Sequence, residues 1–114
     1  MIQRLFAEKV RMLMGYVRVK GIIGNPRRTI VKELDLLVDM GAFYTIIPPS
    51  LAKELNIEPS GKTELTLADK RVAEADIAIA YMKMLDRDGL LPVAIMESPL
   101  PLLGATALEG LGLK

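Results

Sequence analysis

Residues 36–48, LLVDMGAFYTIIP, decide the fold prediction because a single carboxylate stands between two apolar segments. The first three residues are continuously apolar and predict a strand that enters the core, and residues 43–47 predict a second extended segment. Asp39 then lies at the end of a buried strand, where a charge is costly unless it is paired or hydrogen-bonded. Gly41 and Ala42 are small enough for backbone or a ligand to approach closely. The local pattern leaves two interpretations open: a catalytic carboxylate, or a turn aspartate that accepts backbone N–H bonds.

Short strand-like segments surround this stretch on both sides. Residues 16–20 and 63–67 alternate between apolar and polar side chains, as half-buried strands do. Residues 72–85 form the longest strand-like run, and residues 90–96 are expected to pair back onto it through an Asp-Gly turn within residues 86–89. The whole pattern predicts a mostly-β, compact, barrel-like domain of about seven short strands.

Two short helices are also predicted. Pro49 suits the first position of a helix that ends at Asn56, which can adopt the left-handed conformation. Thr106 and Glu109 have the spacing of a capping box, which predicts a short C-terminal helix.

Length and composition restrict the function. The chain has 114 residues, of which 51% are hydrophobic, and its formal net charge is +1. This is the size of one domain, and the balanced charge does not favour nucleic-acid or membrane partners. We divide the chain into an N-terminal extension, residues 1–13, and one domain, residues 14–114. No apolar run reaches the length of about 18 residues expected of a membrane span, so a cytoplasmic location is the expectation.

The sequence contains neither Cys nor His. Thiol and Ser–His–Asp catalysis, zinc fingers and disulfide scaffolds are therefore excluded. Any catalysis must use carboxylates, Lys, Tyr, hydroxyl groups or a metal ion held by oxygen ligands.

The stretch around Asp39 resembles the active-site segment of retropepsin-like aspartic proteases, in which an apolar pair precedes Asp-Thr/Ser-Gly-Ala and a Thr follows. Asp39, Gly41, Ala42 and Thr45 match this pattern in place. Downstream, residues 65–69 are similar to the flap hairpin, with Ala68, Asp69 and Lys70 at its tip. Residues 101–108 are similar to the second hallmark of the family, an apolar pair and a Gly before the C-terminal helix, with Leu103 and Gly104 in those places.

The resemblance implies a retropepsin-like closed β-barrel with one short C-terminal helix. Because the chain has one Asp-x-Gly and is too short for two lobes, it also implies a symmetric homodimer in which two copies of Asp39 share a proton. Gly41 and Ala42 would shape the floor of the site, and Thr45 would support the loop. The implied activity is hydrolysis of extended peptides by an activated water, under a flap formed by residues 64–80. No metal or organic cofactor is required.

Four positions depart from the family pattern. Met40 stands where the family has a Thr or Ser whose hydroxyl braces the two active-site loops across the dimer axis. Phe43 and Ala105 replace an acid and an Arg that pair in viral members, so we expect Phe43 to lie near Ala105. Lys70 stands at the flap tip where relatives often have Gly, so the tip is expected to accept a positive φ less readily.

Met40 keeps an alternative open. The chain can be an active homodimeric endopeptidase, or a catalytically impaired retropepsin-like module for dimerisation or peptide binding. A nucleic-acid-binding barrel has little support because Arg27 and Arg28 form a basic cluster of only two residues and aromatic residues are few.

Overall fold

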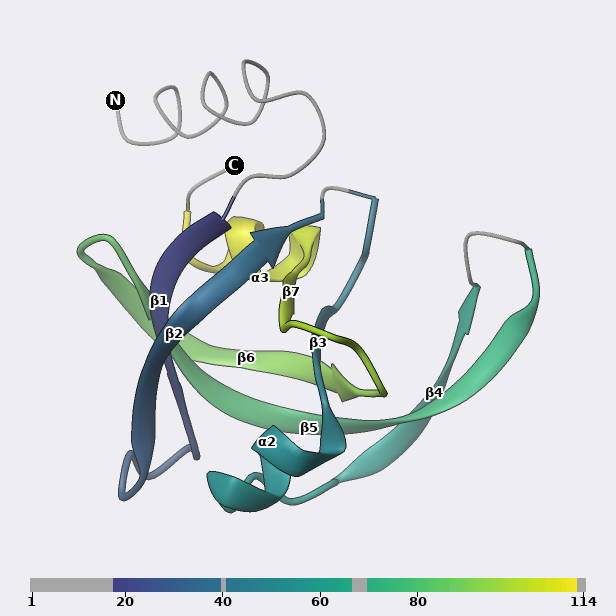
Figure 1. Ribbon diagram of the computed structural model, residues 1–114, viewed down its shortest axis with the longest axis horizontal. Helices are drawn as coiled ribbons and strands as arrows, with labels where there is room; N and C mark the ends of the chain where they lie inside the picture. Colours follow the sequence, from purple (N-terminus) through teal and green to yellow (C-terminus); the bar gives the residue numbers. More distant parts are fainter. Residues whose placement is uncertain (1–17, 40, 67–69, 113–114) are drawn as a thin grey trace.

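The computed structural model describes residues 18–39, 41–66 and 70–112. Within these residues the fold is mostly β, with seven strands and two short helices (Figure 1). In chain order the elements are β1 (Arg18–Gly24), β2 (Val31–Val38), β3 (Thr45–Ile47), α2 (Pro49–Glu54), β4 (Gly61–Thr66), β5 (Val72–Met84), β6 (Arg87–Ile95), β7 (Leu102–Leu103) and α3 (Ala105–Gly110).

The strands form one sheet in the order β1-β2-β7-β3-β6-β5-β4, and β1 also pairs with β5. The β2–β7 and β3–β6 pairs are parallel, and the other pairs are antiparallel. The β4–β5 hairpin curves away from the other strands as an arm (Figure 1). Because β4 ends the strand order, one of its edges has no neighbouring strand in the sheet.

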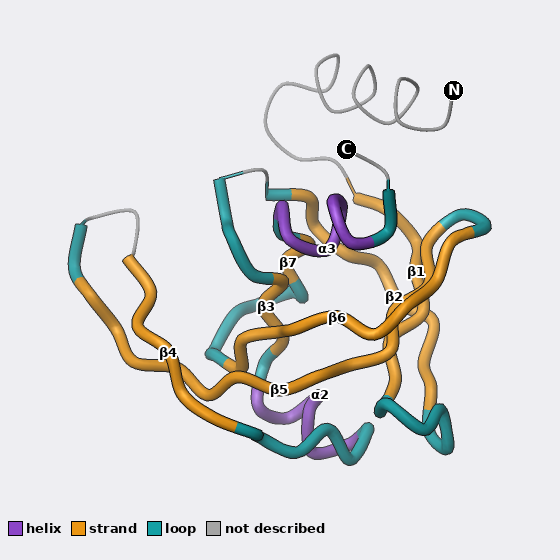
Figure 2. Tube along the Cα trace, turned by 180° about the vertical axis from the view of Figure 1, so that it is seen from behind, coloured by secondary structure: helices purple, strands orange, loops and turns teal. Residues whose placement is uncertain are grey.

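Residues of β1, β2, β3, β5, β6 and β7 and of both helices form the core, and Figure 2 shows these elements from behind. Leu36 of β2, Ile47 of β3 and Leu103 of β7 are fully buried, so the strands that flank the Asp39 loop are anchored in the core. Leu108 of α3 is also fully buried, and α3 packs against β3 and β6. Burying each of these side chains contributes about 1.5–3 kcal/mol, which stabilises the base of the loop.

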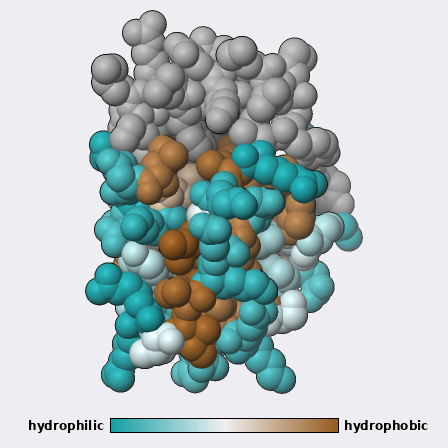
Figure 3. Space-filling view, turned by 60° about the vertical axis from the view of Figure 1, so that its left-hand side comes forward, coloured by the Kyte–Doolittle hydropathy of each residue, from teal (hydrophilic) through white to brown (hydrophobic). Residues whose placement is uncertain are grey.

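Several large apolar side chains remain exposed, and hydrophobic patches between hydrophilic residues are visible on the face turned forward in Figure 3. The exposed large apolar side chains of the domain are Val31, Phe43, Val72, Ile79, Leu85 and Leu90. Among the described residues, no helix is both long enough and apolar enough to cross a membrane.

Local sequence signals predicted the first helix correctly. Pro49 occupies the first turn of α2, and Asn56 closes the helix with a φ of 56°. A turn follows β1, where Arg28 N donates to the Asn25 carbonyl at 2.9 Å.

The predicted Asp-Gly turn is wrong. Met84 pairs directly with Arg87, so the turn consists of Leu85 and Asp86, with a φ of 57° at Leu85. Gly89 lies inside β6, opposite Met82. The reason is tertiary: this register buries Met82 and Met84 in the core, which outweighs the local preference for Gly in a turn.

The capping box is also wrong. Gly104, not Thr106, precedes α3 as its N-cap and supplies no side-chain hydrogen bond. Thr106 lies inside the helix, and its hydroxyl donates to the carbonyl of Phe43 instead. The hydroxyl thus donates to a distant carbonyl instead of accepting a hydrogen bond from a nearby backbone N–H, as the spacing suggested.

Candidate active site

Asp39 begins a tight turn directly after β2. Its backbone N–H donates to the carbonyl of Leu103 at 3.0 Å, and its carbonyl accepts a hydrogen bond from Ala42 N at 3.1 Å. The side-chain Oδ1 accepts a hydrogen bond from Gly41 N at 3.0 Å. Asp39 therefore has the hydrogen bonding of a turn aspartate and is at the same time exposed to solvent, so the carboxylate is both positioned and accessible.

A buried threonine ties this loop to the second apolar motif. Thr45, with no exposed surface, accepts a hydrogen bond at Oγ1 from Gly104 N at 3.1 Å. Gly104 has no room for a side chain, because a Cβ there would lie 2.4 Å from the carbonyl oxygen of Tyr44 and 2.9 Å from that of Ala42. The Gly at this position is thus required by close packing of two backbones.

The start of α3 continues the same contact. Ala105 N donates to the carbonyl of Ala42 at 2.8 Å, and Thr106 N donates to the carbonyl of Phe43 at 2.9 Å. The segments that carry Phe43 and Ala105 therefore lie side by side, as expected. The Phe43 ring, however, is 65% exposed and makes an edge-to-face contact with Tyr44, with ring centroids 4.9 Å apart.

A cleft of about 950 Å³ opens beside Asp39. Asp39, Gly41 and Ala42 line it together with Phe43, Tyr44 and Ile46, and residues 63–66 of β4 face them. Residues 96–98 and Leu102 complete the lining. Three of the lining residues are acidic, namely Asp39, Glu64 and Glu97, and none of the described lining residues is Lys or Arg. A cleft of this volume suits a peptide-sized ligand.

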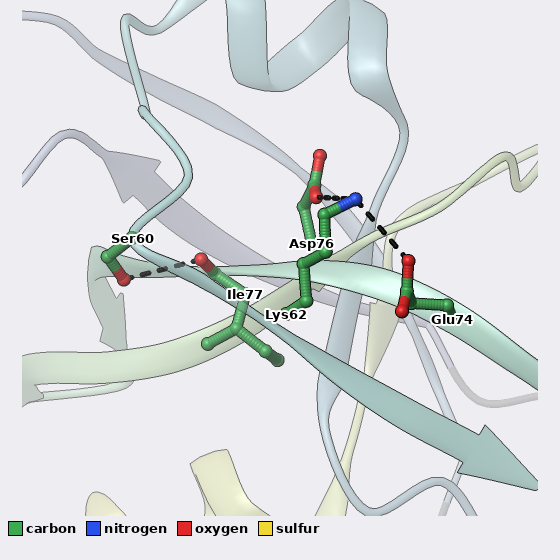
Figure 4. Close-up of polar contacts among 5 residues, drawn as sticks. All are labelled: Ser60, Lys62, Glu74, Asp76 and Ile77. Atoms are coloured by element: carbon green, nitrogen blue, oxygen red, sulfur yellow. Dashed lines mark hydrogen bonds and ion pairs between the residues drawn. The ribbon is translucent and has the colours of Figure 1, made fainter.

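The β4–β5 hairpin beside this cleft is held by polar contacts in the half near its base. Lys62 forms ion pairs with Glu74 at 3.4 Å and with Asp76 at 3.6 Å (Figure 4). The hydrogen bond and charge of Glu74 raise the pKa of Lys62 above its usual value. Nearer the base, the backbone N–H and hydroxyl of Ser60 both donate to the carbonyl of Ile77.

At the tip of the arm, Lys70 is exposed and has a φ of 67°. The position therefore uses the conformation that favours Gly, and Lys adopts it at a steric cost. The other predicted flap residues, Ala68 and Asp69, lie outside the described residues, as do Met40 and the proposed extension at residues 1–13.

The predicted site residues fall into two groups. Asp39, Gly41 and Ala42 line the cleft, whereas Thr45, Leu103 and Gly104 lie behind the loop and hold it. Among the described residues, no three His, Cys, Asp or Glu side chains lie close enough together to hold a metal ion.

Sequence reasoning missed several cleft residues. Tyr44 and Ile46 lie within the quoted motif at alternating positions, so the period of the strand offered a signal for them. Met96 had none, because it reaches the cleft only through the parallel pairing of β3 with β6, where Met96 N donates to the carbonyl of Ile47 at 3.0 Å.

Comparison with known proteins agrees with this geometry. The aspartyl protease family profile matches residues 16–107. No curated protein matches the chain significantly. Among solved structures, the fold is similar to that of EIAV protease in complex with the inhibitor HBY-793, with a TM-score of 0.71 and 18% sequence identity over 90% of this chain and 93% of that one. The chain therefore belongs to the aspartyl protease family, and its fold is that of the retropepsin-like proteases.

Proposed function

We propose that this chain is an aspartic endopeptidase that acts as a homodimer on extended peptides. The observation that carries the proposal is the position of Asp39, exposed in the wall of a peptide-sized cleft on a loop that backbone hydrogen bonds hold in place. Preorganised placement of a reacting group is what such catalysis requires. Asp39 is the proposed catalytic residue.

The dimer follows from the number of carboxylates. The sequence has one Asp-x-Gly, and hydrolysis by this chemistry needs one carboxylate as base toward water and another as acid toward the peptide carbonyl. Two copies of Asp39 meeting at a two-fold axis would share one proton, because two such close carboxylates do not ionise independently. The water would lose a proton to the ionised carboxylate as it attacks the carbonyl carbon, and the carbonyl oxygen would receive the shared proton. The C–N bond would then break as a carboxyl group donates a proton to the leaving nitrogen, which yields a carboxylic acid and an amine.

The arrangement of strands supports an extended peptide as the substrate. The edge of β4 is available for strand-like hydrogen bonds, and residues 63–66 of this strand line the cleft opposite Asp39. The β4–β5 arm would close over the peptide as a flap and exclude water. The pairing of β1 with β5 supports the closed barrel that would carry this arm.

The direct test is peptide cleavage at acidic to neutral pH by the parent chain and by Asp39→Asn. We expect Asp39→Asn to reduce kcat/KM by at least about 10²–10⁴-fold, the range of general acid–base catalysis. Asp86→Asn is the matched control, because Asp86 lies in the exposed turn after β5, and it should cleave like the parent. Equal activity of parent and Asp39→Asn would refute the mechanism.

The oligomeric state is tested by the solution mass at micromolar concentration. A dimer is expected, and a strict monomer that still cleaves peptides would exclude a shared pair of carboxylates. If the parent chain does not cleave peptides, the solution mass shows whether the cause is a missing dimer, since a monomer would lack half of the site.

Met40 supports the alternative of a peptide-binding or dimerisation module with little or no turnover. Under this alternative, Met40→Thr restores the family residue and creates or greatly raises cleavage. If the parent cleaves well and Met40→Thr changes nothing, the impaired module is excluded.

A further inference from the structure

Thr106, in the first turn of α3, binds the carbonyl of Phe43 twice. Its backbone N–H donates to that carbonyl at 2.9 Å, and its side-chain hydroxyl donates to the same oxygen. A carbonyl oxygen has two lone pairs, so both donors can be accepted at once. The two residues are 63 positions apart in the chain, and α3 lies beside the segment that joins β2 to β3 (Figure 1). We call these two hydrogen bonds the Thr106 clamp.

The clamp holds the loop at a residue whose own side chain does not anchor it. The Phe43 ring is 65% exposed, so its burial does little to fix the loop. The preceding residue continues the connection, because Ala42 N donates to the carbonyl of Asp39 at 3.1 Å. The clamped residue is therefore joined covalently to the residue that closes the Asp39 turn.

The position of the Asp39 carboxylate depends on this turn. Gly41 N donates to Asp39 Oδ1 at 3.0 Å, so a shift of the turn backbone would also shift the carboxylate. Catalysis is sensitive to such a shift, because a reacting group must be held in a near-attack geometry. A hydrogen bond that fixes the turn can therefore affect the rate without touching the substrate.

The hydroxyl of Thr106 is better suited to this role than to stabilising the fold. Its hydrogen bond is exposed to solvent, whereas the one that Thr45 accepts is buried. Because water can replace an exposed hydrogen bond, the net contribution of the Thr106 hydroxyl to the free energy of unfolding is small. Thr106 does not line the cleft, so any effect on catalysis must pass through Phe43.

We propose that Thr106 is a positioning residue for Asp39. Its hydroxyl holds the carbonyl of Phe43 and thereby fixes the turn that carries the catalytic carboxylate. The inference rests on the proposed function, because the activity that it supports is that of Asp39.

The first test compares peptide cleavage by the parent chain, Thr106→Val and Thr106→Ser. Val has nearly the shape of Thr but no hydroxyl, and Ser restores the donor. Thr106→Val should lower kcat by about 2- to 10-fold, which corresponds to one lost hydrogen bond, and change KM by less than about 2-fold. Thr106→Ser should regain most of the lost kcat. An unchanged kcat in Thr106→Val would overturn the inference.

Thr29→Val is the matched control. Thr29 is exposed, its hydroxyl accepts a hydrogen bond from Asn25 Nδ2 at 2.6 Å, and it lies at the opposite end of β2 from Asp39. This variant loses a threonine hydrogen bond outside the site and should keep the kcat and KM of the parent. In urea unfolding, Thr106→Val should be no less stable than Thr29→Val. A much lower stability would make the role of Thr106 structural and contradict the proposal.

Amide hydrogen exchange separates this inference from the proposed function, because it requires no cleavage. NMR exchange rates of the Gly41 and Ala42 amides, measured at one pH, should rise about 2- to 10-fold in Thr106→Val and return to the parent values in Thr106→Ser. If no chain cleaves but the rates change in this way, the positioning role is supported and the protease proposal fails. If Thr106→Val leaves the rates unchanged, or Thr29→Val raises them equally, the positioning role is refuted whatever the cleavage assay shows.

Discussion

Replacing Gly104 by Ala should strongly destabilise the domain. The new methyl group would lie 2.4 Å and 2.5 Å from the carbonyl oxygen and carbon of Tyr44 and 2.9 Å from the carbonyl oxygen of Ala42. These are backbone atoms, and the Ala42 carbonyl is also held by Ala105 N. Gly104 has a φ of −98°, which any residue adopts, so the cost is steric rather than conformational.

The magnitude follows from two contributions. Forcing an extra methyl group into tight packing costs about 1–3 kcal/mol. The backbone shift that relieves the clash would also weaken the hydrogen bond from Gly104 N to Thr45 Oγ1, which is worth roughly 0.5–1.5 kcal/mol. A loss of about 2–4 kcal/mol is a large share of the 5–15 kcal/mol or so typical of a domain.

The assay is urea unfolding followed by far-UV circular dichroism at fixed protein concentration. We expect the midpoint of Gly104→Ala to fall by about 1–2 M. Gly61→Ala is the matched control, because a Cβ at Gly61 meets no atom within 4 Å, and it should change the free energy of unfolding by less than about 1 kcal/mol. A midpoint for Gly104→Ala equal to that of the parent would refute the close backbone packing.

Two further stability predictions concern buried or partly buried hydrogen bonds. Thr45→Val should lower the free energy of unfolding by about 1–3 kcal/mol in urea unfolding, because it removes the acceptor of Gly104 N inside the core, whereas Thr45→Ser should lose less; equal stability of the two variants would contradict the role of the hydroxyl. The hydrogen bond from the Tyr81 hydroxyl to Asp88 Oδ2, at 2.9 Å, raises the pKa of Tyr81 above its usual value of 10.0. The protonated phenol is thus favoured in the folded state, so its stabilising contribution is complete below about pH 10 and is lost as the pH rises through the higher folded-state value. Tyr81→Phe should be less stable than the parent near neutral pH, and the difference should shrink in alkaline urea melts; a difference that is independent of pH would exclude this linkage.

The elements that local chemistry defines were predictable. The apolar run before Asp39 predicted β2, and the proline at position 49 and Asn56 marked both ends of α2. The position of Asp39 at the end of a strand also followed from the sequence, because a charged residue after a buried run must leave the core.

The elements that depend on distant partners were not predictable. The turn at Leu85 and Asp86 is set by the burial of neighbouring methionines, not by the Asp-Gly pair nearby. Thr106 has the spacing of a helix cap, but its hydroxyl bonds to Phe43, which is far away in the chain. Local propensities differ by amounts that a single tertiary contact can outweigh.

The sequence by itself determined the family motif, the mostly-β class and the identity of the one candidate catalytic carboxylate, because these depend on residue types at short spacing. Only the tertiary structure decided how Thr45 and Gly104 hold the loop, which side chains line the cleft and that Phe43 is exposed there. The physical reason is that a site is made by contacts between segments about 60 residues apart, and their hydrogen bonds and steric limits exist only once the strands have paired.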